Sequence, residues 1–426
     1  MEKKQFKPKD MLVIGAALFA MFFGAGNLIF PPLLGQQTGT SWLIGFLFFF
    51  IFDVGLALVA ILALINKNEY SITGLTGPMG KVPGAVIGAI GALCIGPFLA
   101  IPRTAATTYE VGVAPLFPGF NTWIFSAVFF AIVLVLTIRP SKVVDIVGQF
   151  LTPVLVIFLL IMIIVGIVNP LGPIELDSTV NAVKEGTYNG YQTLDVIASM
   201  IFIIIIANSA RDKGYTDQAS LAGATIRSSV VAAIGLLIIY GGLTYLGATT
   251  GTLADYQGLD QTTLLVTITK GLFGNTGVIL LGIIVLFACW TTAIGLTSAV
   301  SEYFVELSGG KLKYKTLVII IVIFSWVISN AGVSTIIQFS APLLNLIYPG
   351  LLVLIILAFF HKKIKNNNVY RLAAYFGMIT SALEILAGFG LPTGFVSALP
   401  LSDMGFAWII PAIVGAIIGK FIPSKS

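Results

Sequence analysis

The segment MFFGAGNLIFPP, residues 21–32, decides the fold, because it interrupts the first long apolar stretch of the chain, residues 11–34. A membrane helix needs an unbroken series of backbone hydrogen bonds, whereas this stretch contains Gly24, Ala25 and Gly26, followed by two prolines. Glycine is costly inside a helix, asparagine is a good N-cap, and proline is tolerated in a first helical turn. The sequence therefore predicts two half-helices, at 12–23 and 28–35, with Asn27 as the cap of the second.

Two interpretations fit such a break at membrane depth. Free backbone groups survive there only where protein buries them or where they line a cavity, and a Gly/Pro-interrupted membrane segment is typical of a transporter's binding site. The second half-helix then directs its partly positive end at an anion such as a carboxylate. In the other interpretation, the glycines form a packing notch against a neighbouring helix.

The composition identifies an all-α polytopic membrane protein. Of 426 residues, 57% are hydrophobic and 10% are charged, whereas a soluble domain carries about 25% charged residues. Cys94 and Cys289 lie in apolar stretches and are expected to be free thiols. With His361 as the single histidine, the chain lacks the Cys/His cluster of a zinc site, and it also lacks the phosphate loop of an ATP-driven pump.

Twelve apolar windows are long enough to cross a membrane: 11–34, 41–65, 82–112, 121–138, 146–168, 189–209, 221–249, 274–304, 315–330, 334–360, 370–390 and 405–422. If the N-terminus is cytoplasmic, 20 of the 23 lysines and arginines fall in cytoplasmic termini and loops. The exceptions are Lys184 and Lys270 on the outer side and Arg103 inside the third window. This pattern predicts that both termini are cytoplasmic in the cell membrane. The net charge of +5 reflects this topology and gives no indication of nucleic-acid binding.

The spacing of the windows predicts an internal repeat. The sixth window, like the first, carries polar residues and opens a group of five helices; because five is odd, the second group enters from the opposite side. We therefore expect an inverted repeat with five helices in each half. The predicted organisation is a cytoplasmic N-terminus (1–10), repeat one (11–168), an outer loop (169–188), repeat two (189–360), and helices eleven and twelve with the cytoplasmic C-terminus (361–426). A second long outer loop, 250–273, is expected to carry short helices.

Three motifs resemble those of the bacterial branched-chain amino acid:cation symporters: GAGNLIFPP at 24–32, GPFLAIPRT at 96–104 and TTAIGLT at 291–297. The resemblance covers essentially the whole chain. It implies the LeuT-like fold of the APC superfamily, with a five-plus-five inverted repeat and two additional helices. It also implies uptake of leucine, isoleucine and valine with Na⁺ as the coupling ion, and with H⁺ as the alternative.

A substrate site is expected where the first and sixth helices are broken. Ala25 and Gly26 are expected to offer backbone N–H groups to the substrate carboxylate, with Asn27 adjacent. Asp195 lies in the sixth window, where it pairs with the substrate ammonium, guards the outer entrance, or caps a half-helix near the outer interface. Ala198 and Ser199 are expected in the unwound link below it.

The resemblance also implies a sodium site made of carbonyls of the first helix together with a carbonyl and two hydroxyls of the eighth: Ala20, Phe23, Ala288, Thr291 and Thr292. The last three lie at i, i+3 and i+4, on one helical face, and oxygen ligands suit a hard cation. In the alternative interpretation, these threonines bond carbonyls of their own helix. The pair Thr297 and Ser298 competes for the same role.

Three further charged residues fall in apolar windows. Asp53 is the candidate for proton coupling if sodium is not the ion, and a structural hydrogen bond to another helix is its alternative role. Arg103 and Glu110, seven residues apart on one helical face, are candidate gate charges near the outer vestibule. Their alternative is that each side chain extends to the membrane interface.

The function expected is a secondary active transporter that imports leucine, isoleucine and valine with a cation by alternating access. The alternatives are a proton-coupled symporter and an uncoupled facilitator for small apolar amino acids. An enzyme is not expected, because the scattered acids and a single histidine provide no catalytic set. The partners are a small-molecule substrate and the lipid bilayer, and the sequence leaves the oligomeric state open.

Overall fold

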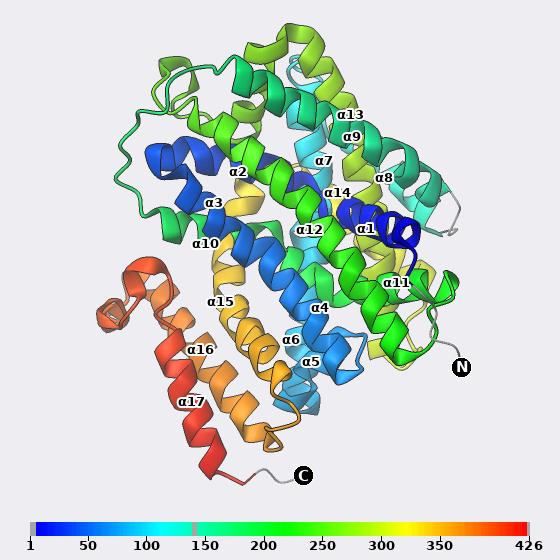
Figure 1. Ribbon diagram of the computed structural model, residues 1–426, viewed down its shortest axis with the longest axis vertical. Helices are drawn as coiled ribbons and strands as arrows, with labels where there is room; N and C mark the ends of the chain where they lie inside the picture. Colours follow the sequence, from blue (N-terminus) through cyan, green and yellow to red (C-terminus); the bar gives the residue numbers. More distant parts are fainter. Residues whose placement is uncertain (1–5, 139–142, 424–426) are drawn as a thin grey trace.

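The computed structural model describes residues 6–138 and 143–423, with the side chains of the second stretch described from residue 153 onward. All regular structure in these residues is helical. The helices are α1 Pro8–Phe22, α2 Ala25–Thr38, α3 Trp42–Phe50, α4 Leu56–Lys67, α5 Ile72–Thr76, α6 Lys81–Leu93, α7 Ala100–Thr108, α8 Thr122–Ile138, α9 Val143–Val168, α10 Ala182–Thr193, α11 Asp195–Asp212, α12 Gln218–Ala248, α13 Gln261–Leu307, α14 Tyr314–Ser329, α15 Val333–Phe359, α16 Asn367–Gly388 and α17 Ile409–Phe421 (Figure 1).

The chain is a multi-pass membrane protein. In the part that the structure describes, seven helical segments are long and apolar enough to cross a membrane, and four shorter apolar helices accompany them. Each of the twelve windows read from the sequence falls on one or more helices. Arg139 and Lys142, which the positive-inside argument used, lie outside the described residues, as do Lys3, Lys4 and Lys425.

The ends of several helices follow from local capping. Several helices begin at a side-chain oxygen that accepts hydrogen bonds from the first free backbone N–H groups, among them Asn181 for α10, Asp217 for α12, Asp260 for α13 and Asn366 for α16. Inside α13, Gly274 adopts a positive φ of 63° and kinks the helix. The part of α13 before Gly274 begins at Gln261 and lies within the segment 250–273, which the sequence predicts to be an outer loop with short helices.

The first predicted break is present, but its cap differs from the prediction. α1 ends at Phe22 and α2 begins at Ala25, with Gly24 at the N-cap. Asn27 is the third residue of α2, and its Oδ1 accepts a hydrogen bond from the N–H of Gly24 (3.3 Å). The helix thus starts earlier than residue 28 because Asn27 stabilises the N-terminus from within the first turn. Pro31 consequently lies inside α2 and not in its first turn.

The second break lies one turn earlier than predicted. α10 and α11 meet at Leu194, whose backbone is left-handed (φ 72°, ψ 6°). Ala198 and Ser199, expected in an unwound link, lie in the regular helix α11, where the hydroxyl of Ser199 donates to the carbonyl of Val196 (2.7 Å). The left-handed residue ends α10 and redirects the chain without a glycine, so composition gave no signal for it. α10 itself begins at Ala182, inside the segment expected as the outer loop 169–188.

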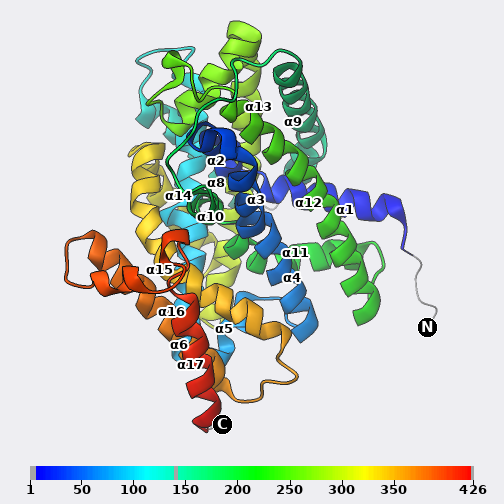
Figure 2. The ribbon, with the colours of Figure 1, turned by 60° about the vertical axis from the view of Figure 1, so that its left-hand side comes forward.

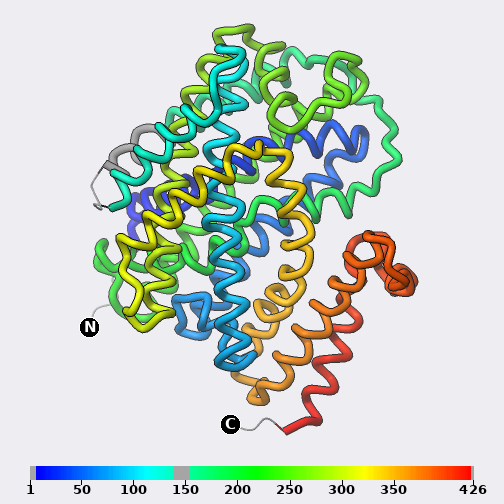
Figure 3. Tube along the Cα trace, turned by 180° about the vertical axis from the view of Figure 1, so that it is seen from behind, coloured from blue at the N-terminus to red at the C-terminus, as the bar shows by residue number. Residues whose placement is uncertain are grey.

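Two π-helical turns shape the helices beside these breaks. One, Ile51–Gly55, joins α3 to α4 and contains Asp53. The other, Cys94–Phe98, joins α6 to α7, with Gly96 in a non-helical conformation. Seen from behind, α6 and α7 form one column through the middle of the bundle (Figure 3). Such turns are frequent at functional sites because they redirect a side chain within an otherwise continuous helix.

The hairpin of α16 and α17 lies at one side of the bundle (Figures 1 and 2). Elsewhere in the bundle, α2 packs against α12 at backbone distance, since a Cβ on Gly35 or Gly247 would overlap the carbonyls of Thr244 and Pro32, respectively. This close approach holds the broken first helix against the bundle. Cys94 and Cys289 are free and buried.

Candidate functional site

A cavity lies between the two helix breaks. Its walls come from α1, α2, α7, α10, α11, α13 and the turn before α7: Met21, Phe22, Gly24, Ala25, Gly26, Asn27, Ile95, Ala100, Arg103, Thr104, Thr193, Leu194, Asp195, Ala198, Phe202, Thr292 and Leu296. Of the residues expected to bind substrate, five line this cavity, and Ser199 does not. The walls combine large apolar side chains with one cation, Arg103, and one anion, Asp195, a set that complements a zwitterion with an apolar side chain.

Asn27 connects the two breaks directly. Its Nδ2 donates to Asp195 Oδ2 (2.8 Å) and to the hydroxyl of Tyr240 on α12 (2.6 Å), while its Oδ1 holds the N–H of Gly24. Tyr240 was not anticipated from the sequence, because it lies in an apolar window with no motif around it. The amide therefore fixes α2, α11 and α12 around one wall of the cavity.

Arg103 is buried in the cavity wall, 3% exposed, and does not extend to the membrane interface. Its Nη1 donates to the carbonyl of Gln192 (2.7 Å) and its Nη2 to that of Thr193 (3.5 Å), and its guanidinium lies over the ring of Phe30. These carbonyls end α10, where a helix carries partial negative charge and favours a cation. Arg103 thus lies at the second break.

Gly26 allows this arrangement. A Cβ added to it would lie 2.7 Å from Arg103 Nη2 and 3.1 Å from the ring of Phe30. Ala25 and Gly26 are the first two residues of α2, so their N–H groups have no partner within the helix. The small residues of the motif therefore let a cation and free backbone donors meet on one side of the cavity.

Asp53 is fully buried behind the second break. Its Oδ1 accepts a hydrogen bond from the hydroxyl of Thr193 (2.8 Å), and the same hydroxyl accepts one from the backbone N–H of Asp195 (3.5 Å). Its side chain is not among those that line the cavity. The structure brings Asp53 and Asp195 together, although they are far apart in the sequence.

Glu110 lies in the π-helical turn Tyr109–Val113 that follows α7. Its Oε1 accepts the N–H of Val333, the first residue of α15, at 2.9 Å, and its Oε2 accepts the hydroxyl of Thr262 on α13 at 2.7 Å. A carboxylate at this position stabilises the N-terminus of α15. Glu110 therefore joins three helical segments, and it is not among the residues that line the cavity.

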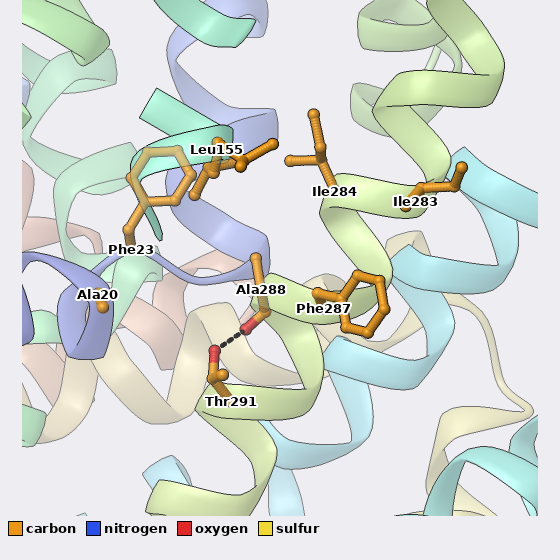
Figure 4. Close-up of a pocket in the computed structure, with 9 residues that line it drawn as sticks. Ala20, Phe23, Leu155, Ile283, Ile284, Phe287, Ala288 and Thr291 are labelled. Atoms are coloured by element: carbon orange, nitrogen blue, oxygen red, sulfur yellow. Dashed lines mark hydrogen bonds between the residues drawn. The ribbon is translucent and has the colours of Figure 1, made fainter. Parts of the chain in front are cut away.

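A second cavity holds four of the five expected sodium ligands. Ala20, Phe23, Ala288 and Thr291 line it together with Val154, Leu155, Ile283, Ile284 and Phe287 (Figure 4). The hydroxyls of Thr291 and Thr292 both donate to the carbonyl of Ala288, at 2.8 and 3.0 Å, so their oxygen lone pairs are free to accept a cation. Thr292 lines the first cavity instead, next to Gly24.

The competing pair lies elsewhere. Thr297 is buried and donates to the carbonyl of Ala293 (2.6 Å), and Ser298 lies 2.9 Å from the hydroxyl of Tyr314. Neither residue lines the two cavities described. Of the two candidate hydroxyl pairs, only the first faces the break between α1 and α2.

The whole chain resembles known proteins. A family model described as "Branched-chain amino acid transport protein" matches residues 7–426. The branched-chain amino acid permease BraB of Bacillus subtilis (strain 168) is 38% identical, over 99% of this chain and 98% of the relative. The branched-chain amino acid permease BrnQ of Escherichia coli (strain K12) is 36% identical, over 97% and 95%.

A solved structure shares the fold. Mhp1, a nucleobase-cation-symport-1 family transporter in a closed conformation with bromovinylhydantoin bound, has a TM-score of 0.66 at 16% sequence identity, covering 97% of this chain and 94% of Mhp1.

Proposed function

The chain belongs to the family of branched-chain amino acid transport proteins, and from this premise we propose that it imports leucine, isoleucine and valine together with a sodium ion by alternating access. The family and its relatives are membrane transporters, and this chain is accordingly a transporter and not an enzyme. The proposal includes twelve membrane-spanning helices with a five-plus-five inverted repeat, and both termini on the cytoplasmic side of the cell membrane.

The observation that carries the proposal is the cavity between the two breaks. Arg103 and the free N–H groups of Ala25 and Gly26 form the end that receives the substrate carboxylate. Asp195 is the anion for the ammonium group. Ile95, Phe202 and Leu296 are among the apolar residues left for the side chain. Leucine, isoleucine and valine differ by at most one methylene or its branching, worth about 1–3 kcal/mol, so discrimination among them is weak.

Sodium is preferred over the proton as the coupling ion because the second cavity offers neutral oxygens. The carbonyls of Ala20, Phe23 and Ala288 and the hydroxyl of Thr291 are hard ligands that carry no proton to exchange. This site adjoins the break in the first helix, so an ion bound there stabilises the conformation of the substrate cavity. The sodium gradient and the membrane voltage then drive uptake.

The test is uptake of labelled leucine into proteoliposomes that contain the full chain. We expect transient accumulation with an inward sodium gradient, and none when potassium replaces sodium at equal concentration. Accumulation driven only by a proton gradient would favour the proton-coupled symporter. Equilibration without accumulation would favour the facilitator, and no uptake under any gradient would overturn the substrate assignment.

A further inference from the structure

Two buried carboxyl groups meet behind the second helix break. Asp53 comes from the π-helical turn between α3 and α4 and is 0% exposed, and Asp195 is the first residue of α11 and is 5% exposed. Thr193 links the two groups: its hydroxyl donates to Asp53 Oδ1 (2.8 Å) and accepts from the backbone N–H of Asp195 (3.5 Å). Two ionised carboxylates only accept hydrogen bonds, so a hydrogen bond between them requires a proton on one.

The hydrogen bonds of the pair leave one oxygen without a donor. Thr193 donates to Asp53 Oδ1, and Asn27 donates to Asp195 Oδ2. Asp53 Oδ2 is buried, and within the residues that the structure describes no donor reaches it. A buried acceptor without a donor is costly, whereas a protonated oxygen at this position becomes a donor itself.

The charged and titratable groups around the pair do not neutralise both acids. Arg103 on α7 is the cation that faces the pair. Its guanidinium donates hydrogen bonds to the carbonyls of Gln192 and Thr193, and not to either acid. Tyr240 on α12 and Tyr348 on α15 also face the pair, but a phenol has no positive charge with which to neutralise an acid. No ion pair joins either acid to a basic side chain in the described chain. If one proton is bound to the pair, one negative carboxylate remains, and the single positive charge of Arg103 balances it.

We propose that Asp53 and Asp195 form a proton-binding pair, in which Asp53 carries one proton and donates it in a hydrogen bond to Asp195, which remains the anion that receives the substrate ammonium. The assignment of the two roles follows from position. Asp53 lies behind the cavity wall, where no substrate atom reaches it, whereas Asp195 lines the cavity. Asp53 is therefore a positioning residue. Only the role of Asp195 in binding the substrate ammonium rests on the proposed function.

Infrared spectroscopy of the purified full chain tests the proton itself, without any substrate. A protonated carboxyl group has a C=O stretching band that a carboxylate lacks, and this band shifts in deuterium oxide. We expect the band in the wild type, its loss in Asp53→Asn, and its retention in Glu384→Gln, which removes a half-buried carboxyl group on α16 outside the cavity. A band unchanged in Asp53→Asn would overturn the proposal.

A second variant guards against misfolding of Asp53→Asn. Thr193→Val removes the hydroxyl that donates to Asp53 Oδ1, whereas Thr193→Ser keeps it. We expect the band to shift in frequency in the valine variant and to stay in place in the serine variant. No difference between the two would show that the protonated group is not Asp53.

Binding of labelled leucine tests the division of roles. An asparagine at residue 53 can still donate an N–H where Asp53 donates its proton, whereas an asparagine at residue 195 removes the anion. We expect Asp195→Asn to weaken leucine binding at least about tenfold more than Asp53→Asn, the loss typical of a charged hydrogen bond. Equal losses of leucine binding in the two variants would overturn the assignment. So would a loss in Asp53→Asn that disappears when the sodium concentration is raised. Failure of the wild type to bind leucine would refute the proposed function and leave the infrared result standing.

Discussion

Gly26 and Gly24 lie two residues apart in the same break, yet they face different neighbours. A Cβ on Gly26 would press against the guanidinium of Arg103, whereas a Cβ on Gly24 would make ordinary contacts of 3.4–3.5 Å with Thr292. The backbone of Gly24 is extended, with φ at −117°, a conformation open to alanine. Residue 26 must therefore be glycine because a Cβ there would overlap the guanidinium of Arg103.

Gly26→Ala is expected to weaken leucine binding by about tenfold or more, because overpacking costs about 1–3 kcal/mol and displaces Arg103. Gly24→Ala is the matched variant, and we expect a loss below about threefold, since no atom must move. Both are measured by equilibrium binding of labelled leucine to the purified transporter. Equal losses in the two variants would show that the break needs glycine for its backbone and not for the cation.

The two candidate hydroxyl pairs of α13 give a prediction about sodium. Thr291→Ala removes an oxygen from the second cavity, so we expect it to raise the sodium concentration for half-maximal leucine binding by about tenfold, the effect of losing one hydrogen-bond-sized interaction. Thr297→Ala, two turns along the same helix, serves as the control, because Thr297 lines neither of the two cavities described. A sodium shift in Thr297→Ala alone would move the ion site to the competing pair.

At the scale of the element, the breaks in the two discontinuous helices are built differently. The first uses glycine and a side chain that bonds back to the N-cap, both of which are local features. The second uses Leu194, a buried leucine in a left-handed conformation, which costs on the order of 1 kcal/mol and persists because the neighbouring helices hold it. Strain of this kind is typical of functional sites.

The contact between α2 and α12 predicts which helix glycines hold the bundle together. Alanine at Gly35 or Gly247 would overlap backbone carbonyls of the facing helix, which cannot move aside, and we expect a loss of stability of about 1–3 kcal/mol or more. Gly295→Ala is the control: apart from the backbone of its own helix and its chain neighbours, no atom of the described residues lies within 4 Å of the added Cβ, and replacing a helix glycine by alanine stabilises by about 0.5–1 kcal/mol. Thermal unfolding in detergent measures all three. A destabilised Gly295→Ala variant would contradict the packing argument.

At the scale of the whole molecule, the proposed orientation places the two ends of α13 on opposite sides of the membrane. Lys270 lies in the part of α13 before the kink, and Lys313 follows the end of the helix; both are exposed. With Cys94 and Cys289 replaced by alanine, we expect a membrane-impermeant maleimide to label Lys270→Cys in intact cells, and to label Lys313→Cys only after the cells are opened. Labelling of Lys313→Cys in intact cells would refute the proposed topology.

The sequence by itself determined the class of protein, the helical segments and the position of the first break, because hydropathy, glycine, proline and caps act over a few residues. It also placed five of the six expected substrate residues in segments that line one cavity. Only the tertiary structure decided where each buried charge finds its partner. Thr193 meets Asp53 across 140 residues, and Arg103 meets Gln192 across 89. Such pairings depend on how whole helices pack, so no local pattern in the sequence predicts them. The second break likewise depends on packing that holds Leu194 in a strained conformation, and no local pattern marks it.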